Sequence, residues 1–329
     1  MKRWVAGAAI LFASACGGNQ AMFNPQGPPA RSIATLGWSL FAVSAVVYVL
    51  VLGTTAWALW RRRRESDNSD ATDRALTRNV TIAVAVTVVI LVGLAAASFA
   101  AGRGLTAPSG QGAVEVDVVG HQWWWNFHYR DVTPSDVVDS PNELHIPVGV
   151  PVVLHLQSAD VIHSFWVPNL QGKRDLIPGF TSTVWIQADR AGVYRGQCAE
   201  FCGHQHANMA AVIVAEPMAA FTAWLQAQRQ PAADPVTDLQ RRGRDVFLQS
   251  TCATCHTVRG TDAGSRVGPE LTHVGSRQML AAGAIPNTRG HLAGWIADPQ
   301  GIKPGSKMPP NVLSPDDLNA VLAYVRSLR

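Results

Sequence analysis

Two long stretches without charged side chains constrain the fold of this chain most strongly. Residues 32–60 and residues 79–102 contain no Asp, Glu, Lys or Arg, and each exceeds the roughly 20 apolar residues that cross a bilayer. Positively charged connections between such stretches remain in the cytoplasm. The sequence therefore predicts a two-helix transmembrane hairpin at 32–103, with a cytoplasmic loop at 61–78 and the rest of the chain outside. The loop holds Arg61, Arg62, Arg63, Arg64, Arg74 and Arg78.

The first residues have the pattern of an export signal. Lys2 and Arg3 precede an uncharged run at 4–15, which has the length of the hydrophobic region of a signal peptide. A box similar to a bacterial lipoprotein cleavage site follows at Ala13-Ser14-Ala15-Cys16-Gly17, although leucine is usual at its first position. We expect a signal or lipoprotein-type segment at 1–16, with ordinary signal cleavage nearby or an uncleaved anchor as the alternatives.

After the hairpin, the hydrophobic pattern changes to short alternating and β-branched segments. This hydrophobic pattern predicts an all-β domain at 113–216. The segments include Val114, Val116 and Val118, and the runs 146–156, 183–187 and 210–214.

The last third of the chain reads as a linker followed by helices. Residues 217–237 are rich in Ala, Gln and Pro. An amphipathic stretch at 238–248 and a final apolar face behind Ser314, an expected N-cap, predict an all-helical domain at 238–329. Helical spacing of Phe221, Trp224 and Leu225 allows a short helix within the linker.

The densest group of metal-binding side chains lies at 198–209. Thiolate and thioether donors select copper or zinc, and a methionine beside cysteine and histidine favours redox copper. Structural zinc is the alternative, but zinc sites usually space their cysteines by two residues and do not use methionine. The donors in this segment are Cys198, Cys202, His206 and Met209.

A second motif accounts for two more of the five cysteines. Cys252-Ala253-Thr254-Cys255-His256 is a C-x-x-C-H run, which predicts covalent haem c on Cys252 and Cys255 with His256 as the proximal iron ligand. A redox dithiol is the alternative, but such motifs sit in strand and helix patterns that are not found around this run. Because Cys16 lies in the export segment, we expect no disulfide in the exported part.

The sixth iron ligand has two candidates. Met308 lies in Lys303-Pro304-Gly305-Ser306-Lys307-Met308-Pro309-Pro310, where prolines favour an extended loop, and we expect it to close the haem site. Met279 competes, but 276–282 reads as a helix, in which a methionine is more often core packing. His273 and His291 are expected to be solvated or hydrogen-bonded.

The 198–209 segment resembles the dinuclear copper A loop of cytochrome c oxidase subunit II. The resemblance implies a cupredoxin-like Greek-key domain, so the fold class is multidomain: a two-helix transmembrane hairpin, an all-β cupredoxin-like domain and an all-α cytochrome c domain. It also implies that Cys198 and Cys202 bridge two coppers, with His163, His206, Met209 and the Glu200 carbonyl as the other ligands. By the same resemblance, the Glu200 side chain reaches a magnesium ion shared with subunit I, and Asp175 supports that region.

An aromatic run at Gly120-His121-Gln122-Trp123-Trp124-Trp125 resembles the family's box beside the copper site. The resemblance implies that electrons enter at Trp123, whereas Trp125 is expected to be packing. One departure concerns a glutamate near the second helix that serves proton uptake in many relatives. No glutamate occurs between Glu65 and Glu115, so that role is not carried over. His121, His128, His145, His155 and His204 are expected to be structural.

Together these features predict subunit II of a bacterial cytochrome c oxidase with a fused cytochrome c domain. Electrons would pass from a quinol–cytochrome c reductase complex or a soluble cytochrome c to haem c, then to copper A, and on to subunit I, where oxygen is reduced. We expect a multi-pass plasma-membrane protein with both metal domains on the outer side and no nucleic-acid partner. The alternatives are the corresponding subunit of a copper-containing nitric oxide reductase and a free-standing electron shuttle.

The two exported domains have opposite charge balances, which the total of +4 conceals. Residues 113–216 hold five Lys and Arg against eleven Asp and Glu, and residues 238–329 hold eleven against seven. Tethered domains of opposite charge favour mutual docking. We therefore expect the haem domain to dock electrostatically near Trp123.

Overall fold

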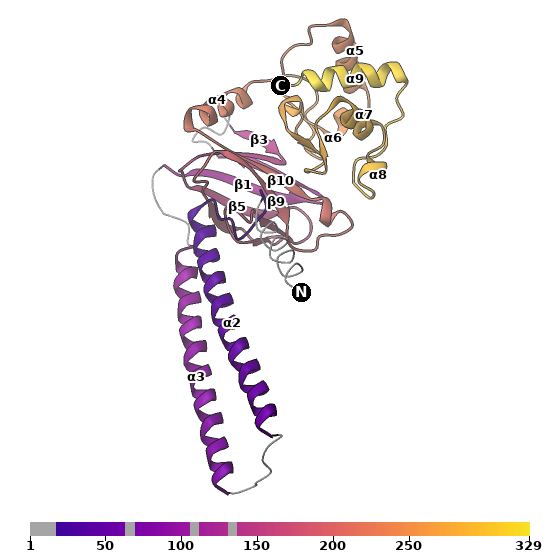
Figure 1. The fold of residues 1–329 in the computed structure, drawn as a ribbon. Helices are drawn as coiled ribbons and strands as arrows, with labels where there is room; N and C mark the ends of the chain where they lie inside the picture. Colours follow the sequence, from indigo (N-terminus) through magenta and orange to yellow (C-terminus); the bar gives the residue numbers. More distant parts are fainter. Residues whose placement is uncertain (1–17, 63–69, 106–111, 131–136) are drawn as a thin grey trace, which may run out of the picture. The chain divides into compact units, whose positions relative to one another are not determined.

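The computed structural model describes residues 18–62, 70–105, 112–130 and 137–329 (Figure 1). It divides into two compact units, one of Arg31–Thr106 and the other of Met1–Ala30 with Ala107–Arg329. The expected export segment at 1–16, with Cys16, lies outside the described residues, as does 63–69 of the expected cytoplasmic loop.

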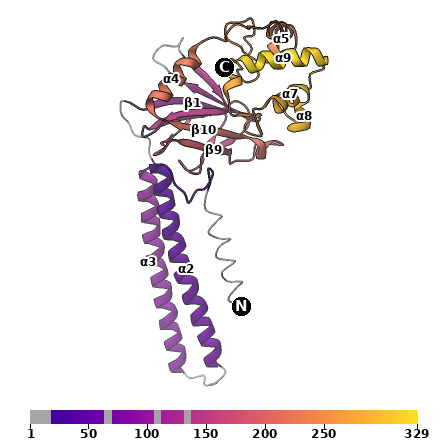
Figure 2. The same ribbon diagram turned by 45° about the horizontal axis from the view of Figure 1, so that its top comes forward.

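The smaller unit is a pair of long helices. Helix α2 spans Pro28–Arg62 and α3 spans Asp70–Arg103, and the two run side by side in Figures 1 and 2. Helix α3 begins nine residues before the uncharged run, so the loop is shorter than expected. Both helices are long and apolar enough to cross a membrane. The most apolar stretch of each helix has no residue buried inside the protein. Apolar surface that is exposed all round suits lipid.

Aromatic and basic side chains meet near the ends of both helices. The Arg61 guanidinium lies 5.2 Å from the centre of the Trp57 ring, and that of Arg103 lies 5.8 Å from the centre of Phe99. Aromatic and basic residues of this kind gather where a membrane span meets water.

The β domain consists of two five-stranded sheets among the described residues. The sheets have the strand orders β3-β2-β1-β5-β8 and β4-β10-β9-β6-β7. Each contains one parallel pair, β1 with β5 and β4 with β10, and the other pairs are antiparallel. This β-sandwich is cupredoxin-like, as expected. The strands are β1 (Val114–His121), β2 (Trp124–Tyr129), β3 (Val138–Pro141), β4 (Glu143–Pro147), β5 (Val152–Ser158), β6 (His163–Trp166), β7 (Arg174–Leu176), β8 (Ser182–Ile186), β9 (Gly192–Cys198) and β10 (Ala210–Glu216).

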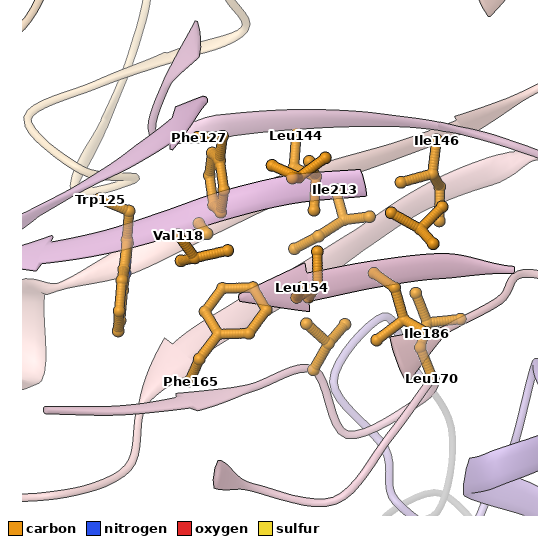
Figure 3. Close-up of a cluster of buried hydrophobic side chains, with 14 of the residues drawn as sticks. Val118, Trp125, Phe127, Leu144, Ile146, Leu154, Phe165, Leu170, Ile186 and Ile213 are labelled. Carbon is orange, nitrogen blue, oxygen red and sulfur yellow. The ribbon is translucent and has the colours of Figure 1, made fainter. Parts of the chain in front are cut away.

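The core lies between the sheets (Figure 3). Strands such as β1 and β2 contribute alternate residues to it, whereas β4 is buried at every position. In β2 the rings of Trp125 and Phe127 point inward while their neighbours are half-buried, because successive strand side chains face opposite sides. The run 146–156 is not one strand. It is divided between β4 and β5 by a turn at Gly149, whose φ of 77° suits glycine.

The linker contains helix α4, Met218–Arg229, which confirms the expected short helix. Phe221 is buried in the β-domain core. The Trp224 ring stacks on His145 with 4.0 Å between ring centres. This packing makes α4 part of the β domain rather than a free tether.

The C-terminal domain is helical apart from a short two-stranded hairpin in its described residues. Its long helices α5 and α9 cross at Gly243, where a Cβ would lie 1.9 Å from the Ala320 carbonyl oxygen. Ser314 caps α9 as expected, because its hydroxyl accepts the Asp317 N–H. The elements are α5 (Asp238–Gln249), α6 (Cys252–Cys255), η3 (Val274–Ser276), β11 (Met279–Leu280), β12 (Ile285–Pro286), α7 (Arg289–Ala297), α8 (Pro299–Ile302) and α9 (Pro315–Ser327).

The prediction of a helix at 276–282 is wrong. Met279 begins the β11–β12 hairpin, and Ala281 and Ala282 have φ values of 52° and 59°. A right-handed helix cannot contain left-handed residues, so the chain turns sharply here. His273 and His291 are hydrogen-bonded as expected, to the Gln230 carbonyl and to Thr288.

Candidate functional site

Four elements bring sulfur and imidazole groups together at one end of the β-sandwich. His163 begins β6, Cys198 ends β9, Cys202 lies in the following loop and Met209 directly precedes β10. The two Sγ atoms are 3.7 Å apart, well beyond the length of a disulfide bond. Cys198 Sγ lies 3.9 Å from His163 Nδ1, and Cys202 Sγ lies 3.6 Å from His206 Nδ1 and 3.8 Å from Met209 Sδ.

The cluster is almost closed to water. His163 and Met209 are fully buried, and both cysteines are buried and free. His163, Cys198 and Cys202 place one ligand atom each within 4.8 Å of the others, which is suitable for holding a metal ion. Two soft thiols, a thioether and two imidazoles facing inward form a donor set that fits copper.

Electrostatics favours a cation between the two thiols. The Cys202 thiol hydrogen-bonds to Cys198 and lowers the pKa of the Cys198 thiol to about 3, with His163 adding to the effect and burial opposing it. The hydrogen-bonded Cys198 and burial raise the pKa of Cys202. One thiolate therefore forms readily, while a second requires compensating positive charge, which a bound metal supplies.

Asp160 orients His163, a role that the sequence analysis did not assign. Its Oδ1 lies 2.9 Å from His163 Nε2, and its Oδ2 accepts the Gln122 N–H at 2.7 Å. Nε2 is thereby occupied and Nδ1 is left to face the sulfur atoms. The His163 ring packs closely against the backbone of Gly120, because a Cβ at that position would lie 2.9 Å from the ring. The i, i+3 spacing of acid and histidine was the available sequence signal.

We expect Asp160→Asn to weaken copper binding about tenfold, the lower end of the loss seen when a partner of a ligating histidine is removed. Copper affinity would be measured by competition with a chelator of known strength. Asp139→Asn is the matched control, because Asp139 holds His128 at the same 2.9 Å but away from the cluster. Equal affinities in the wild type and Asp160→Asn would show that Asp160 does not position His163.

Glu200 of the copper loop and Asp175 of β7 are the other residues to which the resemblance gave a role. The Glu200 carbonyl oxygen lies 3.3 Å from Cys198 Sγ, so it faces the cluster. The side chains of Glu200 and Asp175 are exposed. Their predicted link to magnesium stays a prediction.

Trp123 joins the cluster to a second site. Its indole N–H donates to the Cys202 carbonyl at 3.0 Å, and Gln122 donates to the same oxygen at 2.9 Å. Gly203, with φ of 116°, leaves room for the indole, because a Cβ there would lie 3.0 Å from the ring. Trp125 is fully buried against Phe165, which confirms its expected packing role.

The second site is a mainly apolar cavity of about 380 Å³ that contains the C-x-x-C-H motif. Cys252, Cys255 and His256 all line it. His256 Nδ1 lies 2.7 Å from the Pro269 carbonyl oxygen, so Nε2 is the nitrogen left for a ligand. Burial lowers the pKa of His256 and keeps its ring neutral. These features fit a large apolar group attached through two thiols, as haem c is.

Both candidate methionines line this cavity. Gln300 fastens the loop of Met308 by donating to the Ser306 and Met308 carbonyls, each at 2.8 Å. Met279 enters from the β11–β12 hairpin. The assignment of Met308 as the sixth ligand stays a prediction.

Residues of the β domain complete the wall of the cavity. Trp123, Trp124 and Asn142 line it together with the haem-domain residues. Trp123 thus hydrogen-bonds to Cys202 of the copper-type cluster and lines the haem-type cavity. Three other predicted structural histidines, His128, His145 and His155, each pair with a carboxylate, and His121 stacks on Trp124.

Comparison with known proteins agrees with both sites. The model of the cytochrome c oxidase subunit II periplasmic domain matches residues 114–216, and the cytochrome c model matches residues 240–329. The first family implies copper A and the second implies haem c.

Several known oxidase subunits are similar to this chain over different shares of its length. Cytochrome c oxidase subunit 2 of Alkalihalophilus pseudofirmus is 34% identical over 331 residues, covering 97% of this chain and 94% of the relative. The protein of that name from Bacillus sp. strain PS3 is 31% identical, covering 66% of this chain and 62% of the relative. The subunit II periplasmic domain of Bradyrhizobium japonicum cytochrome oxidase is 27% identical, with a TM-score of 0.35, covering 38% of this chain and 97% of that one. On the full-length similarity, this chain belongs to the cytochrome c oxidase subunit II family and carries a fused cytochrome c domain.

Proposed function

We propose that this chain is the subunit through which electrons enter a bacterial terminal oxidase. They would pass from the fused haem c to copper A and on to subunit I, where oxygen is reduced to water. The observation that carries the proposal is the position of Trp123, which lines the haem-type cavity and hydrogen-bonds to Cys202 of the copper-type cluster.

Six residues are proposed to hold copper A. Cys198 and Cys202 would bridge the two metals, and the nitrogen atoms facing them are Nδ1 of His163 and Nδ1 of His206. When bound, a thiolate-bridged copper pair accepts and releases single electrons. The chain contributes a dry, tightly hydrogen-bonded cradle that changes little on metal reduction. Met209 and the Glu200 backbone carbonyl would complete the ligand set. The Glu200 side chain would reach the magnesium ion shared with subunit I.

Four residues are proposed to hold haem c. Cys252 and Cys255 would attach it, and His256, whose Nδ1 is fixed by the Pro269 carbonyl, would present Nε2 to the iron. Met308 would occupy the opposite face. Exclusion of water by the apolar cavity would raise the reduction potential of the haem.

The helices α2 and α3 would anchor the chain in the plasma membrane as a two-pass hairpin, with the arginine-rich connection inside and both metal domains outside. The proposed partners are subunit I and the other oxidase subunits. The electron donor would be a quinol–cytochrome c reductase complex or a soluble cytochrome c.

Purification of the complex that contains the full chain tests this proposal. We expect its largest subunit to carry oxygen-reducing haems and the preparation to consume oxygen when a reduced cytochrome c is supplied. Reduction of nitric oxide instead of oxygen would assign the chain to a nitric oxide reductase. Recovery of the chain alone, with both metal groups bound, would indicate a free-standing shuttle.

A further inference from the structure

One segment of the haem domain makes several contacts with the surroundings of the copper-type cluster. Lys303 Nζ donates to the Trp123 carbonyl at 2.7 Å. The next carbonyl, of Pro304, accepts the Gln205 amide at 2.6 Å, and Gln205 lies in the loop between Cys202 and His206. This segment, 303–308, ends at Met308, so the loop expected to ligate haem is also attached to the copper loop.

Lys303 is unusual among these residues because it is buried, with 3% of its surface exposed. Lysine is almost never fully buried without partners, because its amine loses its hydration. Burial lowers the pKa of Lys303 to about 7. Its two partners are carbonyl oxygens, so a neutral amine and a charged ammonium can both make the two hydrogen bonds. The contact therefore does not depend on its protonation state.

The two partners of Lys303 lie on opposite sides of the domain contact. One is the Trp123 carbonyl of the β domain, and the other, at 3.1 Å, is the Ala281 carbonyl of the haem domain. Ala281 opens a left-handed turn whose next two carbonyls face the β domain. The Ala282 carbonyl accepts the Ala210 N–H at 2.9 Å, and that of Gly283 accepts from Arg195 at 3.3 Å.

We propose that Lys303 is the positioning residue for electron transfer between the two metal domains, because its amine holds the Trp123 backbone and the 281–283 turn together. The inference rests on the proposed function and deepens it. This contact differs from the docking by overall charge attraction that the sequence predicted. An ion pair between the exposed Lys307 and the half-buried Asp160, at 3.4 Å, does cross the same contact. Pairs open to solvent on one side contribute little, whereas loss of a donor to buried carbonyls is costly.

The test compares Lys303→Met with Lys307→Met in the full chain within the purified complex. Lys307→Met removes a positive charge from the same loop, and Lys303→Met removes at most one, because burial lowers the pKa of Lys303 to about 7. Long-range attraction therefore falls at least as much in the control. We expect Lys303→Met to slow haem-to-copper transfer, followed by flash photolysis, by about tenfold or more, as befits two buried acceptors without a donor. Lys307→Met should slow it by less than about twofold. Unchanged haem and copper spectra in both variants would show that the domains remain folded.

A second readout needs neither metal group. The Ala210 N–H donates to the Ala282 carbonyl, and the Gln278 N–H donates to Glu143 Oε2 at 2.9 Å, so both amides report docking by hydrogen exchange. In the metal-free chain, Lys303→Met should speed exchange at both amides about tenfold, and Lys307→Met should leave it unchanged. Lys303→Arg, which keeps the donors, should restore part of the protection.

Two outcomes would overturn the proposal. One is equal slowing of transfer by both methionine variants, which would assign docking to overall charge. The other is unchanged amide exchange in Lys303→Met. Both are separable from failure of the proposed function, which would appear in the wild type as missing copper or haem signals while the exchange difference between the variants persisted.

Discussion

Serine in place of Cys198 or Cys202 will abolish the mixed-valence copper signal of this protein. The two Sγ atoms lie 3.7 Å apart, and each also faces one imidazole Nδ1. Both sulfurs are therefore placed to bind metal, and our proposal is that two coppers share them. A hydroxyl is a hard donor that does not replace a bridging thiolate for copper.

Electron spin resonance of the copper-loaded full chain measures this directly. The wild type should show the hyperfine pattern of one electron shared by two copper nuclei, and the serine variants should lose it completely. Cys255→Ser is the matched control, because it makes the same change in the haem-type cavity and should leave the copper signal intact. A wild-type protein that binds one zinc ion at this cluster and shows no copper signal would refute the copper assignment.

The sequence was most informative where ligands are close together in the chain. Cys198, Cys202, His206 and Met209 fall within twelve residues, so their spacing alone predicted a shared site. His163 was placed by family resemblance, and the structure brings it to the same cluster from β6. The hydrophobic patterns likewise predicted the membrane hairpin, the all-β domain and the all-helical domain, because alternation and helical spacing are local properties.

Features that depend on tertiary contacts were not predicted. Lys303 appears in the sequence as one of two similar lysines in a loop, and only folding distinguishes the buried Lys303 from Lys307, which is 65% exposed in its side chain. The opposite charge balances predicted that the domains attract each other. The contacts that the structure provides are instead mostly hydrogen bonds to backbone carbonyls, whose directions charge counting cannot reveal.

The error at 276–282 also has a tertiary cause. Ala281 and Ala282 are good helix formers, yet both adopt left-handed backbone conformations here. Their carbonyls and those of the following Gly283 serve Lys303 and the β domain. Tertiary hydrogen bonds have overridden intrinsic propensity, which is expected where a strained turn serves an interface.

The identity of the sixth haem ligand gives the second large expected effect. Met308→Ala should leave haem attached through Cys252 and Cys255 but open the iron to water or carbon monoxide. The Met308 loop is not extended as the sequence predicted, because it turns at 303–306, where the Ser306 N–H donates to the Lys303 carbonyl at 3.0 Å. Gln300 holds the loop at two carbonyls, so it is a fixed support from which a thioether can reach into the cavity.

Met279→Ala is the matched control, since it removes the same side chain from another wall of the same cavity. The loss of the expected helix at 276–282 makes this control essential, because a methionine in a hairpin beside the cavity is a stronger competitor than one in a packed helix. Carbon monoxide difference spectra of the reduced proteins distinguish the two. A carbon monoxide spectrum in Met279→Ala but not in Met308→Ala would transfer the ligand role to Met279. It would leave the 303–308 segment with domain docking alone, because the contacts of Lys303 and Pro304 do not involve either thioether.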